Sequence, residues 1–297
     1  MKRTIIAASS AVLILGSLAA CGSGANSGAS PSLSPTTTAT ASVPADPAQT
    51  TPAPVTTPEP SASASEQPSP SPSSSPEQEE AVALTYRMTK AYRIVPIDKE
   101  KTPSKVVLLT FDDGPKDEAT LKPLLDALDK HKAKAIFFVN GYRVKAHPEL
   151  LKEIDERNQV IGNHSWDHIE LGKEKADKIK EQIGKVQDIV KEVTGKTPVF
   201  FRPPFASSND AVRQVAKDDG LLFMTWSNGS LDWDMNKVAL EKRPQAVIDN
   251  VMEQLHEGSN ILMHELPWTA ETLDNLLTQL EQKGYSFVDP NAIDPTQ

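Results

Sequence analysis

Residues 106–115 read Val106-Val-Leu-Leu-Thr-Phe-Asp-Asp-Gly-Pro115. The apolar start of this stretch, which is rich in β-branched and aliphatic residues, predicts a fully buried strand. The strand ends in two adjacent carboxylates and a Gly-Pro turn, which brings both acids to the rim of a sheet. Because successive side chains on extended backbone point in opposite directions, we expect Asp112 and Asp113 to have different tasks, one holding a metal ion and the other free as a base. The alternative is a solvated turn, since Asp-Gly-Pro is common turn chemistry.

Apolar runs and amphipathic segments alternate downstream of this stretch. The apolar runs predict strands at residues 106–109, 135–139, 160–161, 199–201, 221–226, 260–263 and 285–288. Helical spacing of apolar residues predicts helices at residues 118–132, 149–158, 175–194, 210–219, 244–257 and 272–283. Strands separated by helices favour an α/β fold with a parallel sheet. Residues 86–102 are ambiguous between a short strand and an arm packed on the domain.

Polar residues follow the carboxyl ends of several predicted strands. These residues are Asp112, Asp113, His164, Arg202, Asp232 and His264. Active sites of parallel α/β barrels collect at that face of the sheet. We therefore expect side chains that are far apart in the sequence to converge there.

His164-Ser-Trp-Asp-His168 places two imidazoles four residues apart. On a helical turn the two rings would share a face and bind one metal ion, although pairs at this spacing also arise by chance. With Asp113 as third ligand, such a site would keep coordination positions open for water and substrate, as hydrolytic metal sites do. Asp112 could then take a proton from the attacking water, and His264 could protonate a leaving group. The alternative for His264 is a buried histidine with satisfied hydrogen bonds.

Five ordered motifs within residues 104–290 resemble the polysaccharide deacetylase family, which is carbohydrate esterase family four with its NodB-like domain. The motifs are Thr110-Phe-Asp-Asp-Gly114, His164-Ser-x-x-His168, Arg202-Pro-Pro-Phe205, Asp232-Trp233 and Leu262-Met-His264. The resemblance implies a distorted (β/α) barrel and a divalent metal, usually zinc, with Co²⁺, Mn²⁺ or Ni²⁺ as alternatives. It also implies removal of N-acetyl groups from β-1,4-linked N-acetylglucosamine polymers, or of O-acetyl groups from xylan.

Carried over by position, the resemblance implies a role for each motif residue. Asp112 resembles the catalytic base of the family and His264 resembles its catalytic acid. The metal ligands would be Asp113, His164 and His168. Arg202 would orient Asp112, the backbone N–H of Phe205 would help bind the oxyanion, and Trp233 and Leu262 would line a pocket for the acetyl methyl group. The structural alternative is that Arg202 only forms an ion pair, and that Trp233 and Leu262 belong to the core.

Two positions depart from the family pattern. Phe205 stands where Tyr is common, which leaves a backbone donor intact. Gly229 stands where relatives carry an aspartate that holds the catalytic imidazole and favours its protonated form. Asn228 or Asp232 is then the candidate to replace that carboxylate.

The N-terminus has the pattern of an export signal. Lys2-Arg3 precedes an apolar core from Ile5 to Leu15, which is too short and too interrupted by Ser for a comfortable membrane span. Leu18-Ala-Ala-Cys21 contains the only cysteine of the chain and resembles a bacterial lipobox, in which Cys21 becomes the lipidated N-terminus. The alternative is an ordinary cleavage site with an incidental cysteine. A lipobox would make the mature protein anchored to a membrane, not membrane-spanning.

Residues 22–80 are rich in Ser, Thr, Pro and Ala, and half of the 24 prolines lie before residue 81. With little apolar surface to bury, this segment is expected to be a disordered tether. The tail holds two of the 31 basic and six of the 40 acidic residues, which leaves 29 and 34 in residues 81–297. This acidic balance does not suggest nucleic-acid binding.

Together these features predict a lipid-anchored, metal-dependent deacetylase on the outer face of a bacterial cell membrane, acting in the cell wall. N-acetylglucosamine residues of peptidoglycan are the first expected substrate. The alternatives are a chitooligosaccharide N-deacetylase, a xylan O-acetyl esterase, or a wall-binding lipoprotein that has lost catalysis.

Overall fold

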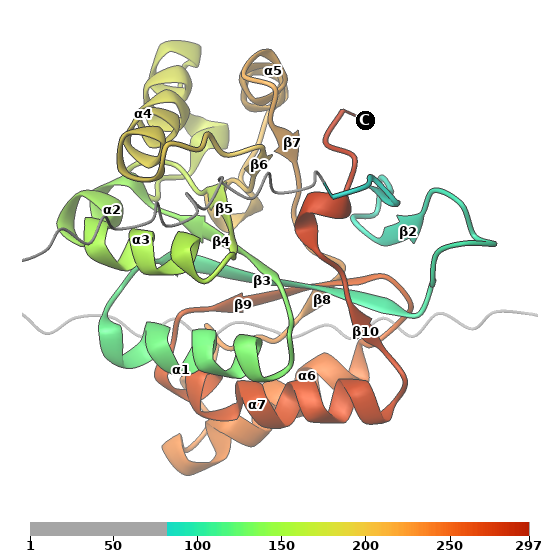
Figure 1. Cartoon of the computed structure of the whole chain (residues 1–297). Helices are drawn as coiled ribbons and strands as arrows, with labels where there is room; N and C mark the ends of the chain where they lie inside the picture. The colour runs from blue at the N-terminus through green and yellow to red at the C-terminus, as the bar shows by residue number, and fades with distance from the viewer. Residues whose placement is uncertain (1–81, 297) are drawn as a thin grey trace, which may run out of the picture. The chain divides into compact units, whose positions relative to one another are not determined.

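The computed structural model describes residues 82–296, which are coloured in Figure 1. The expected signal peptide, the expected lipidation site at Cys21 and the expected tether at residues 22–80 all lie outside these residues. Within residues 82–296, no helix is both long enough and apolar enough to cross a membrane.

The core of the fold is an eight-stranded sheet in which every pairing is parallel. Its strands are β3 (Val106–Gly114), β4 (Ala135–Val139), β5 (Val160–Asn163), β6 (Phe200–Phe201), β7 (Leu222–Phe223), β8 (Asn228–Gly229), β9 (Ser259–His264) and β10 (Ser286–Phe287). The order is β7-β6-β5-β4-β3-β9-β8, and β10 pairs with the start of β3. The sheet curls into a half-barrel, which confirms the predicted α/β fold of distorted-barrel type.

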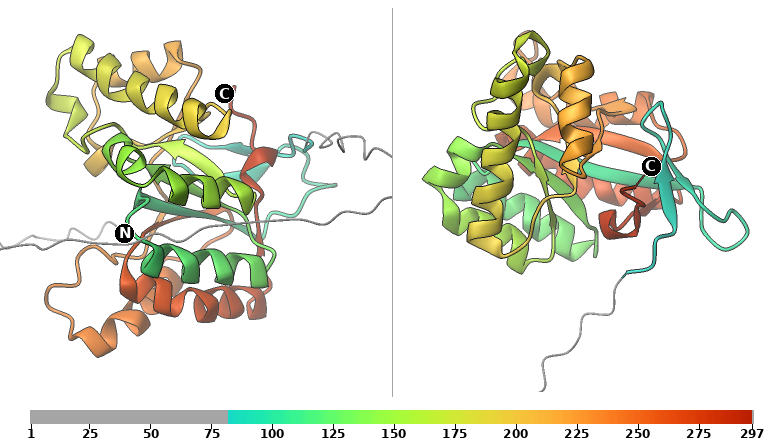
Figure 2. Two further views of the ribbon diagram at one scale, coloured as in Figure 1. Left: turned by 60° about the vertical axis from the view of Figure 1, so that its left-hand side comes forward. Right: turned by 90° about the horizontal axis from the view of Figure 1, so that it is seen from above.

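Helices cover the outside of the curled sheet. They are α1 (Glu118–Lys130), α2 (Gly141–Ala146), α3 (Pro148–Glu156), α4 (Ala176–Thr194), α5 (Asp210–Asp218), α6 (Arg243–Glu253) and α7 (Pro267–Gln282). In the view of Figure 1, α1, α6 and α7 lie below β3 and β9, and α4 and α5 lie above the sheet. Figure 2 shows the same layers from two further directions.

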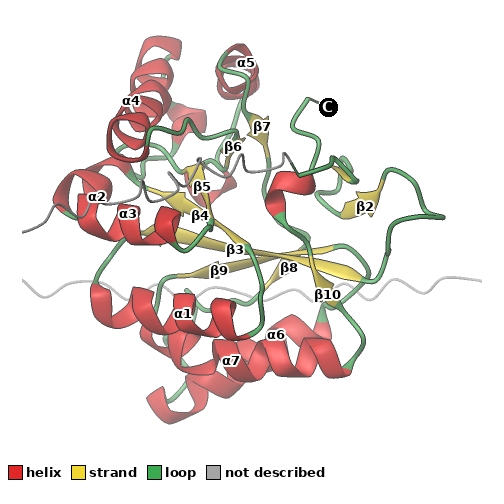
Figure 3. Ribbon diagram, in the orientation of Figure 1, coloured by secondary structure: helices red, strands yellow, loops and turns green. Residues whose placement is uncertain are grey.

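Most predicted elements are confirmed to within a few residues, and the differences have local causes. Strand β3 continues through both aspartates to Gly114. Helix α7 begins at Pro267, where a proline in the first turn costs no hydrogen bond. The short helix α2 was not predicted, because six residues are too few to show a helical period. The ambiguous segment is an antiparallel hairpin of β1 (Tyr86–Met88) and β2 (Ile94–Pro96), seen at the right of Figure 3.

Side chains of β3 alternate between two hydrophobic clusters. Val107, Leu109 and Phe111 pack in the cluster that contains the buried residues of α1 and α7. Val106 and Leu108 pack in a second cluster, which contains residues of the strands and the hairpin but none of these helices, and which therefore fills the inside of the curl. Because strand side chains alternate with period two, the inner face of β3 continues through Thr110 to Asp112. The core thus runs up to the site without a break.

Candidate metal centre and catalytic site

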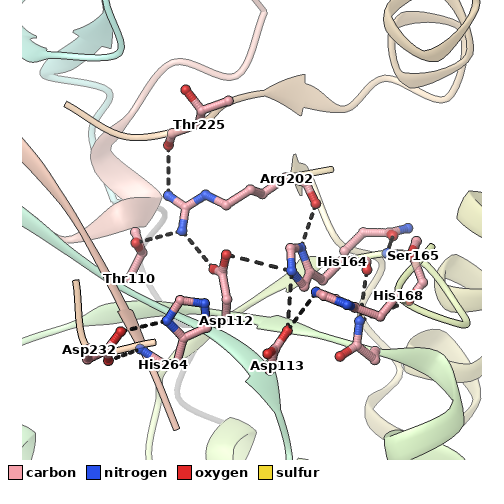
Figure 4. Close-up of polar contacts among 12 residues, drawn as sticks. Thr110, Asp112, Asp113, His164, Ser165, His168, Arg202, Thr225, Asp232 and His264 are labelled. Carbon is pink, nitrogen blue, oxygen red and sulfur yellow. Dashed lines mark hydrogen bonds and ion pairs between the residues drawn. The ribbon is translucent and has the colours of Figure 1, made fainter. Parts of the chain in front are cut away.

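The three predicted ligands meet at the carboxyl end of the sheet. One ligand atom from each of Asp113, His164 and His168 lies within 4.8 Å of the others. Asp113 Oδ1 is 3.0 Å from His168 Nε2 and 3.5 Å from His164 Nε2 (Figure 4). The structure therefore brings the predicted ligand set together.

The two histidines do not lie on a helical turn, so that part of the prediction was wrong. His164 follows β5, and residues 164–168 form an irregular turn with left-handed backbone at Ser165 (φ 64°) and His168 (φ 54°). Asn163 Oδ1 accepts a hydrogen bond from Ser165 N–H at 3.0 Å, which closes the turn locally. A short polar turn thus gives the same convergence of rings that helical spacing would give.

The orientation of His164 is fixed by its other nitrogen. Its Nδ1 lies 2.6 Å from the carbonyl oxygen of Arg202, so this nitrogen carries the proton and Nε2 faces Asp113. The Asn140 side chain donates to the His164 carbonyl oxygen at 2.9 Å. A ring held in this way presents one defined ligand atom, which is how metal-binding histidines are usually oriented.

Asp112 and Asp113 do not point to opposite faces of the sheet, as simple alternation would require. The pairing of β3 with β4 is irregular between Asp112 and Gly114, and Asp113 has a left-handed backbone (φ 68°). This irregularity turns Asp113 into the site, beside Asp112, whose Oδ2 is 3.7 Å from His164 Nε2. The two carboxylates still have different partners, because only Asp112 contacts Arg202.

The donor set fits a divalent cation. Asp113 Oδ1 is buried yet makes no hydrogen bond of normal geometry within residues 82–296. Burial raises the pKa of Asp113, but the two imidazoles outweigh burial and hold it well below its ordinary value, so the group is a carboxylate. An ionised, buried oxygen facing two imidazole nitrogens is an arrangement that a cation would satisfy.

Arg202 occupies the flank next to Asp112. It is fully buried and donates from Nη1 to Asp112 Oδ1 at 2.7 Å and to Thr110 Oγ1 at 2.8 Å. Its Nη2 donates to the Thr225 carbonyl oxygen at 2.8 Å. Burial lowers the pKa of Arg202 and Asp112 opposes that shift; an arginine keeps its charge even so. This ion pair fixes Asp112 while leaving Oδ2 directed at the metal site.

His264 and Asp232 form the opposite flank. His264 Nδ1 lies 2.7 Å from Asp232 Oδ1, and the His264 backbone N–H donates to Asp232 Oδ2 at 2.6 Å. Thr269 Oγ1 donates to the same oxygen at 2.7 Å. Burial lowers the pKa of His264, but Asp232 outweighs burial and raises it above its ordinary value. Of the two candidates for the missing carboxylate, the structure selects Asp232, because the Asn228 side chain donates to Val251 instead.

Three apolar side chains border these polar groups. Phe205 is 66% exposed, has a left-handed backbone (φ 57°), and its ring lies edge-on to His168 with ring centroids 4.7 Å apart. Trp233 packs against His264 with ring centroids 5.2 Å apart. Leu262 is buried on β9, two residues before His264 and on the same side of the strand.

Sequence reasoning missed several residues that support the site. Asn260 Oδ1 accepts from Arg202 at 3.3 Å, and Thr110 Oγ1 donates to the Ile261 carbonyl oxygen at 2.6 Å. Glu265 is buried, with burial raising its pKa to about 7, and its Oε1 accepts from Lys116 N–H at 3.0 Å. Its other carboxyl oxygen lies where a Cβ on Gly114 would be, which explains the glycine. Asn260 could have been found by reading β9 with period two back from His264.

Sequence comparisons find known proteins that are similar to this chain. The family model for polysaccharide deacetylase matches residues 99–224, which contain Asp112, Asp113, His164, His168 and Arg202. Peptidoglycan-N-acetylmuramic acid deacetylase PdaC of Bacillus subtilis (strain 168) is 36% identical over 202 residues, covering 66% of this chain and 41% of PdaC. The chain therefore spans less than half the length of that relative. Peptidoglycan-N-acetylmuramic acid deacetylase PdaA of the same strain is 35% identical over 188 residues, covering 63% of this chain and 70% of PdaA.

Solved structures give a second comparison. A wild-type CE4 family pseudoenzyme from Bacillus anthracis superimposes with a TM-score of 0.58 and 31% identity, covering 62% of this chain and 63% of the other. A mutant of that pseudoenzyme, with restored enzymatic activity, gives the same TM-score at 33% identity and covers 62% of this chain and 65% of that one. Likeness of fold alone therefore does not separate an active chain from an inactive one, and the site residues must decide.

Proposed function

The chain belongs to the polysaccharide deacetylase family, and we propose that it removes N-acetyl groups from a cell-wall polysaccharide by metal-dependent hydrolysis. N-acetylglucosamine residues of peptidoglycan are the first candidate substrate. The observation that carries this proposal is the convergence of Asp113, His164 and His168 between a buried Asp112–Arg202 pair and a buried Asp232–His264 pair.

Each flank has a task in amide hydrolysis. Asp112, held as an acceptor by Arg202, takes a proton from the attacking water. His264, protonated because of Asp232, gives a proton to the leaving sugar nitrogen. A bound divalent cation supplies the Lewis acidity that polarises the acyl oxygen and lowers the pKa of water. Removing a neutral acetyl group needs no further cofactor.

The bordering residues fit the remaining parts of an acetyl group. The Phe205 backbone N–H makes no hydrogen bond within residues 82–296, so it is free to donate to a developing oxyanion. Trp233 and Leu262 supply apolar surface for the methyl group next to His264. The replacement of a tyrosine by Phe205 leaves this backbone donor unchanged.

We propose Zn²⁺ as the bound metal. Two imidazole nitrogens and one carboxylate oxygen form a ligand set that catalytic zinc sites use, with further positions left for water and substrate. Co²⁺, Mn²⁺ and Ni²⁺ accept similar donors. Activity of chelator-treated protein reloaded with each ion in turn would rank the four metals.

Acetate release from three substrates tests the proposed reaction. The full chain should release acetate from peptidoglycan, from chitin oligomers or from acetylxylan, and a chelator should stop the release. Preference among the three separates the peptidoglycan proposal from its two enzymatic alternatives. If a metal-loaded sample binds glycans yet releases no acetate from any of them, the chain is a wall-binding module.

We also propose that the protein is lipid-anchored through Cys21 on the outer face of a bacterial cell membrane. Support comes from Leu18-Ala-Ala-Cys21 and from the Pro-rich residues 22–80 that follow it. At about 3.1 Å per residue, roughly 60 extended residues would reach on the order of 180 Å, enough to carry the domain into a wall. Metabolic labelling with a fatty-acid analogue should mark the wild type but not Cys21→Ser, and equal labelling of both would contradict the anchor.

A further inference from the structure

A second hollow lies at the opposite end of the sheet from the metal centre. It is lined in part by Gly220, Leu221 and Leu222, which lead into β7, and by residues of the β1–β2 hairpin. In a parallel sheet the start of each strand faces away from the edge that carries the site. In Figure 1 the C-terminal segment lies between β7 and β2. The hollow has a volume of about 1060 Å³.

Four cationic side chains line this hollow, and no carboxylate does. They are Arg87, Lys90, Arg213 and Lys217, which together define what we call the basic pocket. No ion pair of residues 82–296 includes any of the four. This concentration of unpaired positive charge stands out in a domain with 29 basic and 34 acidic residues.

Two carboxylates follow Lys217 directly in the sequence, Asp218 and Asp219, and neither forms an ion pair with any of the four cations. Asp218 accepts a hydrogen bond from Gln214 at 2.7 Å. The pKa of Asp219 is raised by burial and by Asp218, with Lys180 as its nearby cation. The four cations therefore remain available to an external anion.

Two aromatic side chains, Tyr92 and Phe223, also line the basic pocket. Tyr92 and Phe223 lie with ring centroids 6.4 Å apart, and the Arg213 guanidinium stacks over Phe223 at 4.2 Å from the ring centroid. Stacking holds the guanidinium plane in place, and apart from a long hydrogen bond from Nη2 to Ser208 Oγ at 3.4 Å its edge can donate to a ligand. The pocket thus combines fixed and flexible cations with an apolar surface.

We propose that the basic pocket binds a chain of phosphate diesters linked by short polyol or sugar units. Guanidinium groups match phosphate oxygens in a bidentate fashion, and lysines neutralise the remaining charge. The carbon units between phosphates would contact Tyr92 and Phe223, which also line the hollow. The net negative charge of the rest of the domain restricts binding to a short stretch of such a polymer.

This site goes beyond the proposed hydrolysis and would act independently of it. A polymer held at the amino ends of the strands leaves the metal centre, at their carboxyl ends, open to a second glycan. The domain would then be retained at a phosphate-bearing surface while its catalytic opening faces outward.

Titration of the full chain with a synthetic oligo(glycerol phosphate) tests the proposal. Four neutralised phosphates predict a slope of log Kd against log salt of about 3 for a flexible chain. The double substitution Arg213→Ala with Lys217→Ala should weaken binding about 10-fold or more and reduce this slope by about half. A control with the same loss of charge at residues that do not line the pocket, Lys191→Ala with Lys283→Ala, should change Kd by less than about 2-fold.

Three outcomes decide the matter. Both double variants should keep a cooperative thermal unfolding transition and wild-type acetate release from chitin oligomers, so a binding defect in the pocket variant alone supports the proposal. If both variants weaken binding equally, the effect depends only on the net charge of the protein, and the proposal is overturned. Binding to phosphatidylglycerol vesicles with no binding to the soluble oligomer would also overturn it, in favour of a lipid surface.

Discussion

The two flanks of the metal centre are built alike, but the side chain that serves the site is a proton acceptor on one flank and a proton donor on the other. Asp112 on β3 and His264 on β9 are register partners on neighbouring parallel strands. Each is held by a buried counter-ion from elsewhere in the chain, Arg202 for Asp112 and Asp232 for His264. One flank therefore fixes a proton acceptor and the other fixes a proton donor.

The difference between the flanks lies in what the counter-ion does. Arg202 holds an anion with a cation that stays charged at every physiological pH. Asp232 raises the pKa of His264, so the second flank depends on pH. In both side chains one polar atom contacts the counter-ion and the other remains available to the site. The available atoms are Oδ2 of Asp112 and Nε2 of His264. Geometry thus separates acid from base although their backbones are adjacent.

Removal of the metal should have the largest effect, because both flanks then lose the group that they serve. We expect His168→Ala to reduce bound metal to near background and to abolish acetate release, as a chelator would do for the wild type. Metal analysis of purified protein measures the first and an acetate assay the second. Restoration of the chelated wild type, but not of the variant, by added metal is the control.

Asp112→Asn should break the acceptor flank alone. Loss of a general base is expected to lower kcat by about 10²–10⁴-fold while the metal content stays near that of the wild type. Acetate release and metal analysis on the same preparation separate the two properties. A variant that loses metal as well would show that Asp112 is a ligand, and the division between the two carboxylates would be wrong.

Asp232→Asn should weaken the donor flank by a smaller factor, about 10²-fold near neutral pH. The Asp232 charge raises the pKa of His264, so its loss lowers that pKa. Protonated His264 is then lost at a lower pH, and the alkaline limb of kcat/KM should move to lower pH. A pH profile of both proteins measures this shift. An unmoved limb would show that another group is the acid.

Gly229→Asp should have the smallest effect. A Cβ at this position would meet no atom closer than 3.5 Å, so a side chain can begin there without a clash. Because Asp232 already occupies His264 Nδ1, the added carboxylate should change kcat by less than about 2-fold. A large gain in rate would mean that Asp232 replaces the missing aspartate poorly.

The convergence of Asp113, His164 and His168 was predictable from the sequence because each lies at or shortly after the carboxyl end of a strand, and parallel strands bring these ends to one rim. It could not predict how Asp113 turns toward the histidines, since that depends on an irregular pairing of β3 with β4. The turn at residues 164–168 was misread as helical for a similar reason. Left-handed backbone at Ser165 and His168 leaves no periodic signal in a sequence.

Counter-ions were only partly predictable. Asp232 was one of two candidates for the carboxylate that holds His264, and only the contact with Nδ1 decides between it and Asn228. Asn260 was missed because a polar residue at the start of an apolar run looks like the solvated end of a strand until its neighbour is known. Long-range contacts of this kind come from the curl of the sheet, which local patterns do not encode.

The alternation along β3 has a consequence for how this chain can change. Val106, Leu108 and Asp112 share one face of the strand, so the spacing that fills the interior also delivers the acceptor to the metal centre. Inserting or deleting one residue ahead of Asp112 would send the apolar side chains and the carboxylate to the wrong sides together. A point substitution can therefore remove activity and leave the fold intact. An insertion or deletion in β3 is expected to remove the fold and the activity together.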